Sequence, residues 1–205
     1  MHRQLFAALA FCSFAFTAFS RNSGTPGGVL RRLNFASFGD DAAITAMATD
    51  PDGNLIVTGT TSNLQTRNAA QPASLEAGVL RSDDLGKTWT RLGRPPEDVK
   101  GVVPDPVYPQ ILFAAGDKGI YKTVDAGQNW RKVYSWTGQF IGALTIDPGN
   151  HLRLAAASYY GPFVRSVDGG ETWTTIAASP YHVAADPNGS GGLLACVVAV
   201  LTRLA

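Results

Sequence analysis

One eight-residue pattern occurs three times in this chain and constrains its fold more than any other feature. It reads [Ser/Thr]-x-Asp-x-Gly-x-[Thr/Asn]-Trp, and the closing tryptophans are 41 and 43 residues apart. The pattern residues are Ser82, Asp84, Gly86 and Trp89; Thr123, Asp125, Gly127 and Trp130; and Ser166, Asp168, Gly170 and Trp173. A fixed period of this length indicates a chain built from one supersecondary unit used several times.

A second marker keeps the same period. Asp-Pro pairs begin at Asp50, Asp105, Asp147 and Asp186, with steps of 55, 42 and 39 residues. The long first step is explained by a polar insertion near residues 62–77. Because two independent markers agree, we interpret the period as a structural repeat.

Each period predicts four short strands, since short apolar or alternating runs are bounded by Gly, Pro, Asn and Asp. The strands expected in the second period are 99–103, 110–115, 119–123 and 129–134, and those in the third are 140–146, 152–157, 163–166 and 172–177. Four strands per 40–45 residues is the blade of a β-propeller. We therefore expect an all-β fold, a partial β-propeller with blades near 39–93, 98–135 and 139–178 and an incomplete one at 181–205.

The chemistry of the repeated pattern needs no ligand. Its aspartates are expected to accept hydrogen bonds from backbone N–H groups of their own turns. Its glycines are expected to supply the positive φ that closes each hairpin, and its tryptophans to bury their rings at the hairpin base. The predicted role of the pattern is structural.

The three octets resemble Asp-box repeats, also called bacterial neuraminidase repeats, which occur in sialidases, sortilin-type receptors, xyloglucanases and photosystem assembly factors. Residues 48–61 are similar to a second bacterial propeller repeat, with Asp50, Gly53 and Asn54 in its pattern. Together the two resemblances cover residues 39–190. They imply a propeller but not a ligand, because Asp boxes in that family are structural hairpins remote from the active site.

The N-terminus predicts a signal peptide at residues 1–20, followed by a lead-in strand or linker at 21–38. A mildly basic start precedes apolar residues 5–19, and Ala18 and Ser20 are small residues before a cleavage point. Fifteen positions are too few for a membrane span, which needs about 20 apolar residues. We expect a bacterial protein that is secreted, periplasmic or on the cell surface.

Charge and residue usage exclude several classes of function. Without Arg3, the chain has 16 Lys and Arg against 16 Asp and Glu, so nothing predicts binding to nucleic acid or to an anionic membrane. Beyond the leader, Cys196 is the single cysteine, and His151 and His182 are the histidines. No internal disulfide, metal site or cofactor is therefore expected.

The repeat does not complete a further copy before the end of the sequence. A fourth pattern would follow Trp173 by about 42 residues, beyond Ala205. We expect other propeller blades to be missing from this chain. A shifted reading frame near Gly191 is the alternative.

The acids and the aromatic residues outside the repeated pattern are the candidate functional groups. Glycoside hydrolysis needs two facing carboxylates, whereas most acids here belong to the repeated turns and none lies in a recognisable catalytic motif. The loops opposite the Asp boxes carry the candidate ligand residues Trp136, Tyr159, Tyr160, Tyr181 and Asp117. Exposed aromatic rings suit stacking on a sugar or gripping a peptide, but the same rings could fill gaps between blades.

We therefore expect a secreted, non-catalytic interaction module that binds a carbohydrate or a protein surface. The alternative is a fragment of a sialidase-like or xyloglucanase-like glycoside hydrolase. The third option is a truncated propeller piece without a function of its own.

Overall fold

The structure is a computed structural model that describes residues 43–60, 78–93, 95, 98–136, 141–158, 161–178, 182–185, 193–197 and 200–204. The predicted leader and lead-in, residues 1–38, lie outside the described residues. So do three of the candidate ligand residues, Tyr159, Tyr160 and Tyr181.

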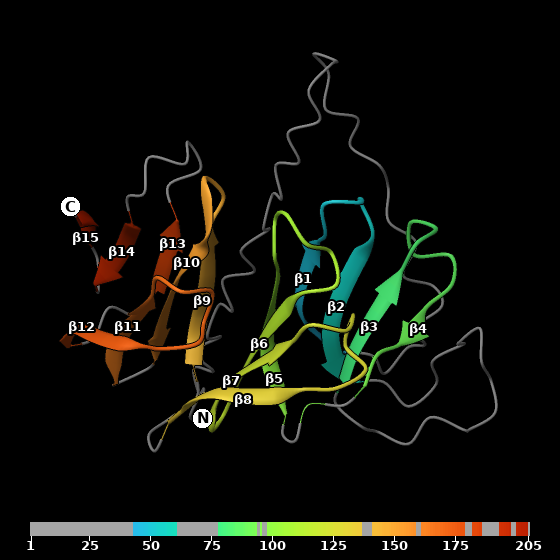
Figure 1. Cartoon of the computed structure of the whole chain (residues 1–205), viewed down its shortest axis with the longest axis horizontal. Coiled ribbons are helices and arrows are strands. Elements are labelled where there is room, and N and C mark those ends of the chain that lie inside the picture. Colours follow the sequence, from blue (N-terminus) through green and yellow to red (C-terminus); the bar gives the residue numbers. More distant parts are fainter. Residues whose placement is uncertain are drawn as a thin grey trace, which may run out of the picture.

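Strands are the regular elements of the described chain, and they form four antiparallel sheets (Figure 1). The first sheet holds β1 (Ala43–Thr49), β2 (Leu55–Thr60), β3 (Gly78–Ser82) and β4 (Thr90–Arg91). The second holds β5 (Val99–Pro104), β6 (Leu112–Gly116), β7 (Gly119–Thr123) and β8 (Arg131–Ser135). The third holds β9 (Ile141–Asp147), β10 (Asn150–Ser158), β11 (Pro162–Ser166) and β12 (Thr174–Ala178). The fourth is three-stranded, with β13 (His182–Ala185), β14 (Leu193–Val197) and β15 (Val200–Leu204).

The strand order within every sheet follows the chain, so each strand pairs with the one before it. The first strands form the inner row: β1 lies beside β5, β5 beside β9, and β9 beside β13. In Figure 1 the first and fourth sheets lie at opposite ends of this row. Successive four-stranded sheets arranged in this way are propeller blades, so the predicted all-β, partial β-propeller is confirmed. No helix of the described chain is long and apolar enough to cross a membrane.

Antiparallel pairing sorts the connections onto two faces. The turns after β1, β5 and β9 and the three repeated hairpins, residues 82–89, 123–130 and 166–173, lie at one end of the strands; we call this the turn face. The β6–β7 connection at residues 117–118 and the ends of β8 and β10 lie at the opposite end, the loop face.

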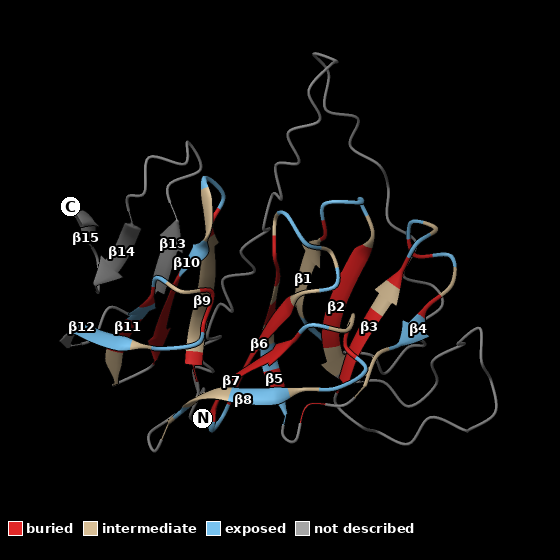
Figure 2. Ribbon diagram, viewed as in Figure 1, coloured by how far each residue is buried: buried red, intermediate tan, exposed pale blue. Residues whose placement is uncertain are grey.

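The core lies between the sheets, and β6 shows why its sequence suits that position. All five of its residues are buried (Figure 2). Leu112 and Ala114 pack toward the first sheet, and Phe113 and Ala115 pack toward the third. A strand covered on both sides reads as an unbroken apolar run. Burial of a side chain such as Phe113 contributes about 1.5–3 kcal/mol.

In the second sheet, two strands begin later than their sequences predict, because turn hydrogen bonds take the preceding residues. The strand expected from residue 110 begins at Leu112, since Ile111 N–H donates to the Tyr108 carbonyl at 2.9 Å. The strand expected from residue 129 begins at Arg131, since Asn129 donates from its backbone and side chain to Asp125.

Candidate functional site

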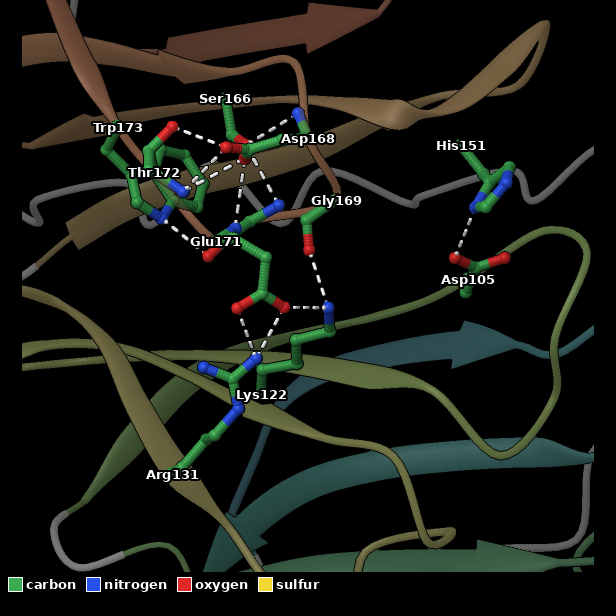
Figure 3. A network of polar contacts seen from close by, with 11 residues as sticks. Asp105, Lys122, Arg131, His151, Ser166, Asp168, Gly169, Glu171, Thr172 and Trp173 are labelled. Atoms are coloured by element: carbon green, nitrogen blue, oxygen red, sulfur yellow. Dashed lines mark hydrogen bonds and ion pairs between the residues drawn. The ribbon is translucent and has the colours of Figure 1, made fainter.

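The repeated hairpins share one hydrogen-bond network, seen for the third copy in Figure 3. The buried Ser166 hydroxyl accepts a bond from Gly170 N–H at 2.8 Å and donates to Asp168 Oδ1 at 2.7 Å. Asp168 Oδ1 also accepts from Thr172 N–H at 2.9 Å. The equivalent bonds in the other copies are Gly86 to Ser82 at 2.7 Å, Thr88 to Asp84 at 2.8 Å, Gly127 to Thr123 at 2.9 Å and Asn129 to Asp125 at 2.9 Å.

These bonds hold the hairpin carboxylates in their charged form. The pKa of Asp125 is lowered to about 2, first by the backbone N–H of Asn129 and then by the Thr123 hydroxyl. The pKa of Asp168 is lowered below its usual range, first by the Thr172 hydroxyl and then by the Thr172 N–H. A carboxylate whose lone pairs are used in this way is poorly suited to proton transfer.

The third hairpin also docks on the blade that precedes it. Lys122 of β7, whose side chain is 9% exposed, donates to the Gly169 carbonyl at 2.8 Å and to Glu171 Oε1 at 2.7 Å. Arg131 donates to both Glu171 oxygens at 2.5 and 2.6 Å (Figure 3). Hydrogen bonds from Arg131 and then Lys122 lower the pKa of the Glu171 carboxyl. The hairpin therefore joins two blades as well as two strands.

The hairpin tryptophans occupy equivalent positions, each directly before the fourth strand of its sheet. Trp130 packs on the core between the first and second sheets, and its indole N–H donates to the Gly93 carbonyl at 2.7 Å. Trp173 packs on the core between the second and third sheets. Trp89 is fully buried in a cluster of the first sheet.

The loop face brings together the two candidate ligand residues that are described. Asp117 is exposed in the tight β6–β7 connection. The backbone N–H of Trp136 donates to the Lys118 carbonyl at 2.9 Å, which fixes the end of β8 beside that connection. Asp117 and Trp136 thus belong to one small region of the surface.

Trp136 is half-buried because its ring packs across the boundary between the second and third sheets. A Cβ added to Gly161 would lie 1.9 Å from a ring carbon of Trp136, so a glycine is required under the indole. The Tyr134 ring also lies near the indole, with 6.2 Å between the ring centroids. The indole N–H is buried and has no acceptor among the described residues. In the described part of the chain, packing contacts therefore position this ring.

Strand register adds an acid that motif reasoning did not single out. Val99 pairs with Gly116 at the end of the β5–β6 ladder, so the next residues outward are Asp98 and Asp117. Both are exposed. The position of Asp98 at this end of the sheet follows only from the β5–β6 register, which the sequence does not give directly.

A different polar cluster lies on the turn face. Asp105 is buried and its Oδ2 lies 3.0 Å from His151 Nδ1 in the next blade (Figure 3). Within the described ranges, no three His, Cys, Asp or Glu residues are grouped to hold a metal ion.

Comparison with known proteins identifies propellers. No protein-family profile matches the chain. A xyloglucanase from Paenibacillus sp. is 28% identical over 192 residues, covering 72% of this chain and 18% of that protein. The crystal structure of the Niastella koreensis GH74 enzyme is similar with a TM-score of 0.56 and 20% identity, covering 74% of this chain and 25% of that one. The GH74 xyloglucanase from Xanthomonas campestris gives a TM-score of 0.55 and 21% identity, covering 78% and 28%.

The structural similarities establish the fold. The chain spans about a quarter of the length of these solved enzymes and less than a fifth of the Paenibacillus relative.

Proposed function

We propose that this chain forms part of a secreted β-propeller that binds a plant-type β-glucan, with xyloglucan as the first candidate. The observation that carries the proposal is the 28% identity to a xyloglucanase over 72% of this chain. The predicted leader at residues 1–20 would direct export. In this proposal the repeated hairpins are Asp boxes that hold the blades together, as the sequence resemblance implies.

We assign binding to the loop face. Asp117 is exposed there in the tight β6–β7 connection. Its carboxylate oxygens are suited to accept a hydrogen bond from a sugar hydroxyl. Trp136 lies beside it, fixed in orientation by Gly161 and Tyr134, and a rigid aromatic ring suits the apolar face of a pyranose. Tyr159, Tyr160 and Tyr181 remain candidates for the same surface.

Retardation of the full chain in native gels that contain xyloglucan tests the proposal. Asp117→Ala is expected to weaken retardation by about five- to a hundredfold in apparent Kd, the range for an interface hot spot. Asp83→Ala, an exposed acid on the turn face, is the matched control and should leave binding unchanged. Wild-type mobility that is unaffected by xyloglucan would refute the proposal.

A glycoside hydrolase is the second candidate, and it is favoured by two exposed acids, Asp98 and Asp117, that follow directly on the last β5–β6 pair. A retaining mechanism needs two carboxyl groups about 5–5.5 Å apart, one as the nucleophile and one as the acid and base. Release of reducing ends from xyloglucan would test it. Activity that is abolished by Asp117→Asn and by Asp98→Asn, with thermal stability unchanged, would replace the binding proposal with the enzyme.

A further inference from the structure

The turn face carries an aromatic pair that the proposed loop-face site does not use. Tyr108 lies in the turn after β5, and His151 lies at the start of β10, so two neighbouring blades supply the pair. The ring centroids are 5.3 Å apart and the planes meet at 75°, an edge-to-face arrangement. Such a pair keeps both rings in a defined orientation.

Asp105 organises the turn that presents Tyr108. Its Oδ1 accepts bonds from Val107 N–H at 2.8 Å and Tyr108 N–H at 3.0 Å. The Tyr108 carbonyl accepts from Ile111 N–H at 2.9 Å and closes the turn. The Asp105 side chain is 3% exposed, so these bonds form away from water and the backbone of Tyr108 is rigid before any ligand arrives.

The second oxygen of Asp105 fixes His151. Nδ1 of His151 lies 3.0 Å from Asp105 Oδ2. Because a carboxylate accepts, the hydrogen-bond pattern assigns the proton of the neutral imidazole to Nδ1 and leaves a lone pair on Nε2. That lone pair is suited to accept a hydrogen bond from a hydroxyl group.

The pair stays open to solvent in spite of this support. Tyr108 is 45% exposed, and Val107, the preceding residue of the same turn, is 53% exposed. The result is an exposed aromatic ring on a rigid turn, next to one oriented hydrogen-bond acceptor. A protein partner would need about 800 Å² of contact on this side, whereas one pyranose ring needs a single aromatic face and a few hydrogen bonds.

We propose that Tyr108 and His151 form a second pyranose-binding subsite, on the opposite face from Asp117 and Trp136. The inference rests on the proposed function, since it assigns the same class of β-glucan ligand to a further place on the propeller. The sugar would lay its C–H face on Tyr108 and donate a hydroxyl to Nε2 of His151. Two subsites on opposite faces would allow one chain to bridge two polysaccharide strands.

Titration of the full chain with a xyloglucan heptasaccharide, followed by NMR, tests the subsite. The resonances to follow are the Tyr108 ring, the His151 imidazole and the Trp136 indole N–H. We expect saturable shifts at Tyr108 and His151. Tyr108→Ala should weaken this binding event at least about fivefold, and Tyr108→Phe, which keeps the ring, should stay within about twofold.

The outcomes separate the two proposals. Saturable shifts at Trp136 without shifts at Tyr108 and His151 would overturn the subsite and leave the proposed function standing. Shifts at neither face would overturn both. Because the wild-type shifts alone decide the matter, loss of folding in a variant does not prevent the test.

Discussion

Gly170→Ala tests whether the third hairpin docks on the preceding blade. Gly170 has φ of +83°, and an added Cβ would lie 2.7 Å from Cε1 of Phe113, which is 1% exposed. The left-handed conformation costs an alanine about 1–2 kcal/mol, and overpacking a full core adds about 1–3 kcal/mol. Alanine also lowers the conformational entropy of the unfolded chain, which offsets about 0.4–1 kcal/mol of this cost. We therefore expect a net destabilisation of roughly 2–4 kcal/mol.

Gly53→Ala is the matched control. Gly53 has φ of +82°, nearly the same conformation, but an added Cβ would have no atom within 4 Å. Its cost should therefore contain the backbone strain without the steric overlap. The difference between the two variants isolates the contact between hairpin and blade, with an expected size of about 1–3 kcal/mol.

Urea denaturation, followed by tryptophan fluorescence, measures this difference as a change in midpoint at constant slope. If Gly170→Ala and Gly53→Ala are equally destabilising, the hairpin does not pack on Phe113 and the docking of successive blades described above is wrong.

Three other substitutions test the hairpin network. Thr123→Ala should lower the free energy of unfolding by about 1–3 kcal/mol, since it leaves the buried Gly127 N–H without its acceptor. Thr123→Ser keeps the hydroxyl and should lower it far less, so equal losses of stability in urea denaturation would contradict this role. Ala126→Gly should stabilise the chain by up to about 1 kcal/mol, because Ala126 has φ of +57° where the third hairpin has Gly169. A lower melting temperature of the variant would show that the Ala126 backbone is not strained. Glu171→Gln should lower the free energy of unfolding at neutral pH, and the difference from wild type should shrink below about pH 4.5. The folded state lowers the Glu171 pKa, so the charged carboxylate stabilises the fold above the ordinary pKa of a glutamate, and this stabilisation is lost as the pH falls. A difference that does not depend on pH would show that the ion pair with Arg131 contributes little.

The sequence predicted the elements that local chemistry determines. The spacing of the repeated pattern was sufficient to predict all-β blades, because each blade is a local unit with its own turns. It did not predict which blade each hairpin contacts. Lys122 and Glu171 are 49 residues apart, and His151 and Asp105 are 46 apart. Such pairs depend on the angle and spacing between sheets, which no single repeat specifies.

The candidate site shows the same division. Asp117 could be placed at a strand connection from its flanking glycines, but the position of Asp98 at the same end of the sheet follows only from the β5–β6 register. Trp136 lies outside the repeated pattern, which the sequence shows directly. Its half-buried position follows from Gly161 of the next blade, a contact between segments that the sequence separates by 25 residues.

Calorimetric titration of the full chain with a xyloglucan heptasaccharide tests the central claim most directly. The account predicts saturable binding without release of reducing sugar, and a reduction in affinity of at least about fivefold for Asp117→Ala. A titration that shows no heat of binding at saturating oligosaccharide, confirmed by unchanged thermal stability in its presence, would contradict the claim that this propeller binds a β-glucan.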